Sequence, residues 1–252
     1  MSFDTLLTAF QTILWDYLLV YLLCGTGILY TFLLKGIQVR KFKSALKTLI
    51  AKFSLSGKRA DKKGMSSFQA VSTAIAGQVG TGNLAGPATA IIAGGPGALF
   101  WMWVSSFFGM ATIYAEAILA QKYRTYDRTG QIVGGPAYYI EKGLGIKWLA
   151  ILFAIFIILA LGIIGNMVQS NSIASAFEKS LSIPTWITAL VVSLLVAFVI
   201  IGGIRNIAAF TEKVVPSMAF FYLLGAIIVL GLNYQYIFPA LKMIVIAAFN
   251  PE

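Results

Sequence analysis

The chain has 252 residues, of which 59% are apolar and only 11% are charged, with a net charge of +10. A soluble domain is nearer half apolar and one quarter charged, so this composition indicates a membrane protein. The basic residues sit between apolar segments, which argues against a nucleic-acid partner. Without histidine and with Cys24 as its single cysteine, the chain excludes Ser-His or Cys-His catalysis, a histidine-ligated metal and an internal disulfide. We expect neither an enzyme nor a cofactor.

Apolar segments long enough to cross a membrane recur along the chain. The first lacks the basic start of a secretory signal and is too long for one, so we expect a retained span. The predicted spans are 10–34, 66–94, 97–121, 147–177, 184–203 and 214–233. Each reaches the roughly 20 residues that a helix needs to cross the hydrocarbon core, the second only if its glycine-rich stretch is included. A shorter run at 237–249 is expected to be interfacial or a partial element. The predicted fold is an all-α membrane protein with six transmembrane helices.

The connections predict the orientation of these spans. Ten Lys and Arg lie in the 35–63 loop, five in 122–147 and two in 204–213, which leaves only Lys179 and Lys242 for the other side. Cytoplasmic loops carry such an excess, so we expect a multi-pass protein of the cell membrane with its N-terminus outside.

The first basic loop also shows helical spacing, with lysines on the opposite face. Its apolar residues at this spacing are Phe42, Ala45, Leu46, Leu49, Ile50 and Phe53. The pattern favours an amphipathic helix on the inner leaflet over a solvated basic linker.

The second span contains an unusual stretch, GQVGTGNLAGPATAIIAGGPG (77–97), with seven glycines and two prolines. These residues weaken or interrupt helices. Irregular backbone at membrane depth is viable only where protein buries it or where it lines a watery cavity. One alternative is a continuous helix packed through the Gly82-xxx-Gly86 motif. The density of glycines favours two half-helices joined by an unwound segment at Gly80–Asn83.

Such a joint suits a small zwitterion and a hard cation. The half-helix that begins near Asn83 offers free N–H groups and a positive dipole end to a carboxylate. The half-helix that ends near Val79 offers unpaired carbonyls to Na⁺. Thr81 and Asn83 add side-chain oxygens, and no charged side chain is needed.

Three motifs then resemble the alanine or glycine:cation symporter family. They are STAIAGQVGTGNLAGPATAIIAGGPGALFWMWVSSFFGMATIYAEAILAQKYR (72–124), GGPAYYIEKGLG (134–145) and GNMVQSNSIA (165–174). The resemblance covers nearly the whole chain and implies Na⁺-coupled symport of alanine or glycine. It also implies the inverted-repeat fold of sodium-coupled amino-acid symporters, and GTGN is similar to the break in their first core helix.

The resemblance also implies roles for individual residues. Thr81, Gly82 and Asn83 would meet the substrate carboxylate. The carbonyls of Ala76 and Val79 would hold Na⁺, with no other metal expected. The substrate-facing residues expected from the fourth span are Gln169, which matches a family glutamine, and Asn166, three residues before it. Polar residues in this apolar span should face the bundle interior, and the alternative role for them is interhelical hydrogen bonding.

Two other features of the third span are less specific. Glu116 lies six residues before Lys122; a structural ion pair or hydrogen bond is the favoured interpretation over a proton or cation role. Phe100, Trp101 and Trp103 are expected in the outer aromatic belt.

The resemblance implies that this chain holds one repeat of a five-plus-five transporter. The expected parts are an extra N-terminal helix (1–36), a basic cytoplasmic loop (37–64), the first five-helix repeat (65–233) and an external connection (234–252). We therefore expect Na⁺-coupled symport to be incomplete in this chain alone. The alternatives are a non-transporting fragment that needs a separately encoded second half, and a channel with a glycine-rich filter. The expected partners are a small neutral amino acid, Na⁺ and the lipid bilayer.

Overall fold

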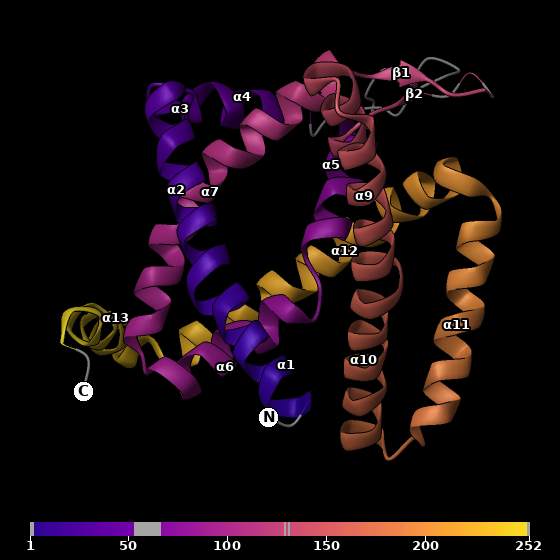
Figure 1. Ribbon diagram of the computed structural model, residues 1–252. Helices are drawn as coiled ribbons and strands as arrows, with labels where there is room; N and C mark the ends of the chain where they lie inside the picture. The colour runs from indigo at the N-terminus through magenta and orange to yellow at the C-terminus, as the bar shows by residue number, and fades with distance from the viewer. Residues whose placement is uncertain (1–2, 53–66, 129, 131, 251–252) are drawn as a thin grey trace.

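The computed structural model describes residues 3–52, 67–128, 130 and 132–250, and these are almost entirely helical (Figure 1). The chain begins with one continuous rod that contains a π-helical stretch. Its parts are α1 (Phe3–Thr12), η1 (Ile13–Leu19) and α2 (Val20–Leu33). Two further helices, α3 (Ile37–Arg40) and α4 (Phe42–Lys52), then run across the end of α2. The predicted amphipathic helix is therefore present as α4, whereas Phe53 lies outside the described residues.

The second predicted span is interrupted. It consists of α5 (Ser67–Gln78) and α6 (Gly82–Gly94), which are joined by three residues without helical structure. A turn at Gly95 with a φ of 70° leads into the long helix α7 (Gly97–Lys122). Glycine tolerates this left-handed conformation, which explains the sharp reversal between α6 and α7.

A short hairpin follows α7, and its strands are β1 (Thr125–Tyr126) and β2 (Ile132–Val133). They pair antiparallel, with Thr125 opposite Val133. The chain then enters α8 (Pro136–Tyr139) and the π-helical η2 (Ile140–Leu144). The next rod comprises α9 (Lys147–Ile157), the π-helical η3 (Ile158–Gly165) and α10 (Asn166–Leu181).

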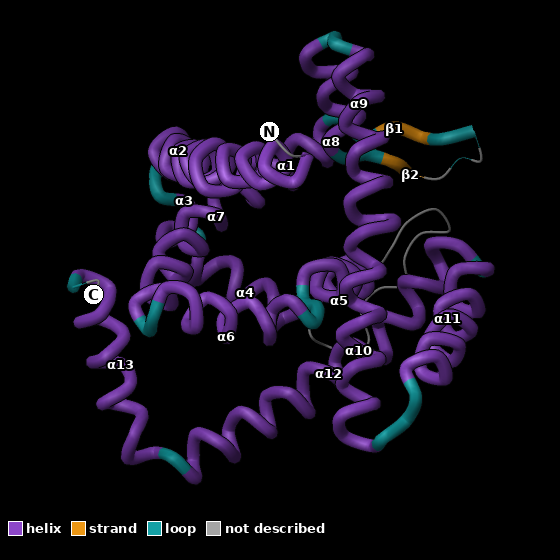
Figure 2. Tube along the Cα trace, turned by 60° about the horizontal axis from the view of Figure 1, so that its bottom comes forward, coloured by secondary structure: helices purple, strands orange, loops and turns teal. Residues whose placement is uncertain are grey.

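The last three helices are α11 (Thr185–Ile201), α12 (Gly203–Leu232) and α13 (Tyr234–Phe249). Figure 2 shows α12 and α13 as successive rods, with α13 returning toward the start of α7. There the Trp101 indole donates a hydrogen bond of 3.1 Å to the carbonyl of Ala248. Trp101 also packs edge-on against Phe100 and Phe249. The expected belt residue Trp101 therefore fixes α13 against α7.

Four stretches in the described part of the chain are long and apolar enough to cross a membrane. They are Asp4–Leu33, Gly97–Lys122, Lys147–Leu181 and Asn206–Leu232. The helix Thr185–Ile201 is apolar but has 17 residues, and the predicted span 66–94 is divided between two short helices. The all-α membrane class is confirmed, whereas the count of six spans and the five-helix repeat stay predictions.

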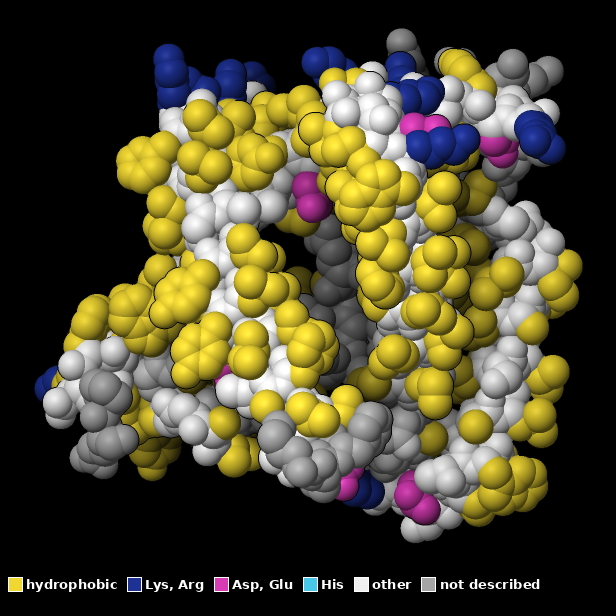
Figure 3. Space-filling model, viewed as in Figure 1, with side chains coloured by type: hydrophobic (Ala, Val, Ile, Leu, Met, Phe, Trp, Pro, Cys, Tyr) yellow, Lys and Arg dark blue, Asp and Glu magenta, His cyan; other side chains and the backbone are white. Residues whose placement is uncertain are grey.

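The helices meet through small residues. Among the most buried positions are Ala111, Ala115 and Ala208. Gly27 of α2 lies against Phe108 of α7, so closely that a Cβ on the glycine would be 3.0 Å from the Phe108 Cβ. Small residues allow this approach in membranes, where apolar burial between helices gives little driving force. Large apolar side chains cover the outside instead, as the yellow belt of Figure 3 shows.

Candidate functional site: the break between α5 and α6

The break is short and lies close to the predicted segment Gly80–Asn83, but it is shifted toward α5, because Gly82 and Asn83 already belong to α6. The N–H of Val79 still donates to the carbonyl of Ile75 at 2.8 Å, which is the last hydrogen bond of the first half-helix. The second half-helix starts with the carbonyl of Thr81, which accepts from the N–H groups of Leu84 and Ala85 at 3.1 Å each. Val79, Gly80 and Thr81 are therefore the unwound residues.

Asn83 forms two hydrogen bonds with the backbone of Gly80 in the break. Its side-chain Oδ1 accepts the Gly80 N–H at 3.0 Å, while its own N–H donates to the Gly80 carbonyl at 3.1 Å. This reciprocal pair satisfies a donor that would otherwise be an orphan of the helix end. The Nδ2 group of Asn83 has no acceptor among the described residues, so it is free for a ligand.

The remaining backbone groups at the break point to two kinds of ligand. Within the described chain, no N–H donates to the carbonyls of Ala76 or Val79 at the end of α5. The N–H groups of Thr81 and Gly82, at the start of α6, find no acceptor there either. The Thr81 hydroxyl is likewise without a partner in the described residues. Unpaired carbonyls thus lie at the C-terminal end of α5, where the helix dipole is negative. Unpaired N–H groups lie at the N-terminal end of α6, where the dipole is positive.

Gln169 comes to this break from α10. A Cβ built on Gly80 would lie 3.2 Å from the Gln169 Oε1, so the amide rests directly against the Gly80 backbone. The close approach explains why glycine suits this position. Asn166 behaves differently, because its Nδ2 donates to the carbonyl of Gly162 in its own helix at 3.1 Å. Of the two polar residues expected from this span, one lies at the break and the other bonds to its own helix.

A polar seam that the sequence analysis missed holds α5 against α12. Gln69 donates from Nε2 to the Oε2 of Glu212 at 2.8 Å, and the hydroxyls of Thr73 and Thr211 lie 3.2 Å apart. Ser72 is buried beside them. The signal in the sequence is the presence of polar residues in two apolar segments, but their pairing is not readable without the fold.

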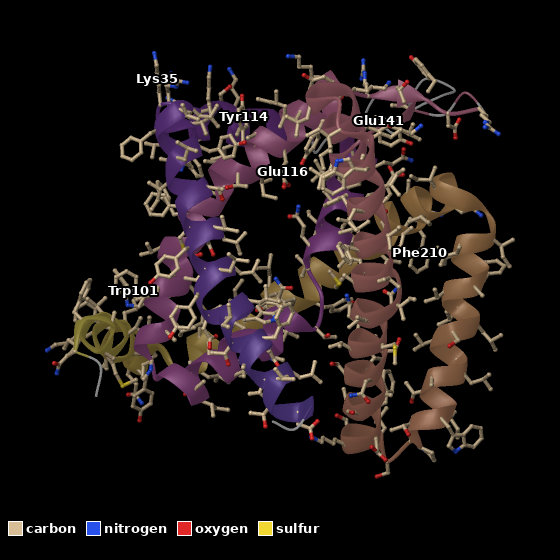
Figure 4. All side chains as sticks on the ribbon, in the orientation of Figure 1. Lys35, Trp101, Tyr114, Glu116, Glu141 and Phe210 are labelled. Atoms are coloured by element: carbon tan, nitrogen blue, oxygen red, sulfur yellow. The ribbon has the colours of Figure 1, made fainter. Side chains whose placement is uncertain are left out.

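Glu116 lies on α7, six residues before the end of that helix at Lys122, and its side chain is exposed (Figure 4). It forms no hydrogen bond or ion pair within the described part of the chain, so the favoured structural ion pair is not found there. The Glu116 carboxylate acts electrostatically on Tyr139 of α8, which lies outside the membrane spans. Burial, the Glu116 carboxylate and Tyr30, in that order, raise the pKa of Tyr139.

Most Lys and Arg side chains in Figure 3 gather at the end that holds α3, α4 and the β1–β2 hairpin. This distribution agrees with the predicted placement of the basic loops on one side of a membrane. Which side faces the cytoplasm stays a prediction.

Comparison with known proteins gives the family. The chain matches the sodium:alanine symporter family over residues 1–252. It is 45% identical to the sodium/alanine symporter AgcS of Methanococcus maripaludis, over 99% of this chain and 55% of that protein. It is 43% identical to an uncharacterized transporter of Haemophilus influenzae, over 100% of this chain and 54% of the relative.

A third relative is the putative sodium/proton-dependent alanine carrier protein YrbD of Bacillus subtilis, 41% identical over 95% of this chain and 48% of the relative. The chain thus spans about half the length of the curated relatives it matches. With four apolar spans among its described residues, it is a membrane-embedded protein. The coverage of the whole chain by the family and the identity to these relatives show that the chain belongs to the sodium:alanine symporter family.

Proposed function

We propose that this chain supplies one wall of the substrate cavity of a Na⁺-coupled symporter for a small neutral amino acid, alanine or glycine. The observation that carries this proposal is the break between α5 and α6. Its carbonyls at one end and N–H groups at the other have no partners in the described chain, and the Gln169 amide lies against it. The names of the relatives AgcS and YrbD support alanine as the substrate.

The cation would bind at the end of α5. The carbonyls of Ala76 and Val79 are hard oxygen ligands, and the negative end of the α5 dipole favours a positive charge there. No charged side chain is required, which avoids the cost of a carboxylate at membrane depth. The polar seam between α5 and α12 then has a role, because it fixes the half-helix that presents these carbonyls.

The substrate carboxylate would bind at the start of α6. The N–H groups of Thr81 and Gly82, the Thr81 hydroxyl and the Asn83 Nδ2 are donors that converge on this helix end. Gln169 would contact the bound amino acid from the opposite helix. Asn166 would do so only after releasing the carbonyl of Gly162, so we assign it the weaker role.

The proposed organisation follows the family resemblance. Residues 1–36 form the extra helix, 37–64 the cytoplasmic loop, 65–233 the first five-helix repeat and 234–252 an external connection, with the N-terminus outside. The relatives are roughly twice as long as the stretch they share with this chain, and we infer that the opposite wall of the cavity comes from such additional sequence. Alternating access needs this second unit, because one repeat rocks against the other.

A chimera tests this function. Residues 1–252 are combined in one polypeptide with the part of AgcS that this chain does not match, and the product is reconstituted in proteoliposomes. We expect alanine uptake driven by a Na⁺ gradient, and its loss in Asn83→Ala and Thr81→Ala. The matched controls are Asn233→Ala and Thr89→Ala, since both side chains bond to carbonyls of their own helices away from the break.

Uptake without a Na⁺ gradient, or full uptake by both variants at the break, would show that the site is assigned wrongly. A second arm uses the 252-residue chain alone. We expect no uptake from it, and Na⁺-dependent uptake would contradict the inference that the cavity needs a further wall.

A further inference from the structure

Five exposed basic side chains follow the end of α2 within a short distance. They are Lys35, Arg40, Lys41, Lys43 and Lys47, and we call them the juxtamembrane basic surface. The sequence from residue 17 to residue 60 contains no Asp or Glu, so neighbours along the chain cannot neutralise these charges. A cluster of this size beside a membrane span has the composition of a surface that attracts anionic lipid.

The backbone turns this segment sideways. Lys35 and Gly36 both adopt left-handed conformations, with φ of 53° and 61°. Such a conformation is disfavoured for lysine, so the turn is a specific feature of the fold. Arg40 donates from Nη2 to the carbonyl of Leu34 at 3.3 Å and ties the new direction to the end of α2. Figure 1 shows α3 and α4 lying across that end rather than continuing its axis.

Apolar side chains accompany the charges. Val39, Phe42 and Leu46 are 70%, 64% and 45% exposed, although water disfavours such exposure. Phe42 and Leu46 are four residues apart on one face of α4, and Val39 precedes them on α3. An exposed aromatic and aliphatic row beside lysines is the pattern of a helix that lies in the membrane interface. Long lysine side chains reach from such a helix to the headgroup level.

The four lysines of this surface have no partner among the described residues, whereas Arg40 bonds to the Leu34 carbonyl. Within the described part of the chain, no hydrogen bond or ion pair reaches the Nζ of Lys35, Lys41, Lys43 or Lys47. Lys35 points away from the helices in Figure 4, and dark-blue side chains crowd this corner in Figure 3. A general excess of cytoplasmic lysine does not by itself explain the sideways turn or the apolar row. Both features fit a surface that meets phosphate groups at the edge of the bilayer.

We propose that the juxtamembrane basic surface binds the phosphate headgroups of anionic phospholipids in the leaflet around the end of α2. The lysines contact the phosphates, and Phe42 and Leu46 enter the upper acyl region. Each bound headgroup neutralises lysine charge that the described residues leave unpaired. The contact fixes α3 and α4 against the membrane.

The test compares two variants that each lose three positive charges. One is Lys41→Gln/Lys43→Gln/Lys47→Gln. The control is Arg128→Gln/Lys142→Gln/Lys147→Gln, whose exposed side chains lie in the hairpin turn, in η2 and at the first residue of α9. The whole chain is purified in detergent and mixed with equal amounts of phosphatidylglycerol and phosphatidylcholine, and native mass spectrometry measures the bound lipid. One lysine near an anionic surface is worth about a fivefold change, so the first variant should lose phosphatidylglycerol preference on the order of a hundredfold.

We expect the control to keep the preference, and the preference of the wild-type chain to fall as salt is raised. In Lys43→Gln alone, the preference for phosphatidylglycerol should fall about fivefold. This single variant keeps the test valid if the triple variant does not fold. Retained preference in both the single and the triple variant would overturn the proposal, as would an equal loss in the control. Displacement of the lipid by an equal concentration of inorganic phosphate would also overturn it, because it would indicate a site for free phosphate.

Discussion

Replacing Gly27 by alanine tests how closely α2 approaches α7. A Cβ at this position would lie 3.0 Å from the Cβ and 3.1 Å from the backbone carbon and oxygen of Phe108. Because backbone atoms cannot rotate away, the two helices have to separate by a few tenths of an ångström. Gly25 on the same helix provides a matched control, since a Cβ there would meet nothing within 4 Å.

The expected difference follows from two opposing effects. Overpacking a tight contact costs about 1–3 kcal/mol. Replacing glycine by alanine inside a helix stabilises it by about 0.5–1 kcal/mol, because the unfolded chain loses less freedom. Gly25→Ala should show the second effect alone. Gly27→Ala shows both, so it should be less stable than Gly25→Ala by about 1–3 kcal/mol.

The assay is an SDS titration of the chain in detergent micelles, followed by tryptophan fluorescence. Trp101 and Trp103 lie on α7 and report its environment. Both variants and the wild type are measured under the same conditions. Equal midpoints for Gly27→Ala and Gly25→Ala would refute the reasoning, because they would show that α2 does not depend on close approach to α7.

Three further predictions concern the break and its surroundings. Gln69→Leu should destabilise the chain by about 1.5–3 kcal/mol in the SDS titration, because it removes a hydrogen bond to the Glu212 carboxylate. Asn83→Ala should accelerate hydrogen exchange at the Gly80 amide, which loses its 3.0 Å acceptor. The pKa of Tyr139 is raised above its ordinary value of 10.0, so the folded state holds this proton more tightly than the unfolded state. Its contribution to stability should be complete below pH 10.0 and should disappear as the pH rises through the raised pKa; Tyr139→Phe should lack this dependence.

Each of these predictions has a control within the chain. Thr8→Val removes a hydroxyl whose hydrogen bond is local and exposed, so its effect should be well below that of Gln69→Leu. Thr89→Ala, on the same half-helix, should leave exchange at Gly80 unchanged. For the tyrosine, Tyr126→Phe in the exposed hairpin should retain the loss of stability at high pH. A larger loss of stability in Thr8→Val than in Gln69→Leu would contradict the role of the Gln69–Glu212 bond. Faster exchange at Gly80 in Thr89→Ala than in Asn83→Ala would contradict the role of the Asn83 side chain. A pH dependence that Tyr126→Phe loses and Tyr139→Phe keeps would contradict its assignment to Tyr139.

The helix break was accessible to sequence reasoning because it depends on local chemistry. Glycines at 77, 80, 82 and 86, followed by Pro87, disfavour a continuous helix wherever the chain folds. Asn83 suits such a joint because its side chain can accept a backbone N–H, and the structure shows it doing so. The amphipathic pattern of α4 was predictable for the same reason, since periodicity is also local.

Tertiary pairing was not accessible in this way. Gln69 and Glu212 are 143 residues apart, and nothing in their local sequence links them. Trp101 is expected in the outer aromatic belt from its place near a span end, and that position alone does not predict the hydrogen bond of its indole to Ala248 of α13. Asn166 and Gln169 are three residues apart, so their spacing predicts a similar helix face. Only the three-dimensional path of η3 and α10 separates them, bringing Gln169 to Gly80 and leaving Asn166 on its own helix.

The proposed function also gives a physical reason for coupling between the cation and the amino acid. Unpaired backbone groups at membrane depth cost several kcal/mol each, and Asn83 offsets only one of them. A cation would satisfy the carbonyls of Ala76 and Val79, and a carboxylate would satisfy the amides of Thr81 and Gly82, but either ligand alone leaves the other half of the break unpaired. Bound together, the two opposite charges also attract each other where water is scarce and the attraction is strong. We infer that this shared backbone, rather than a dedicated ion pair, makes each ligand strengthen the binding of the other.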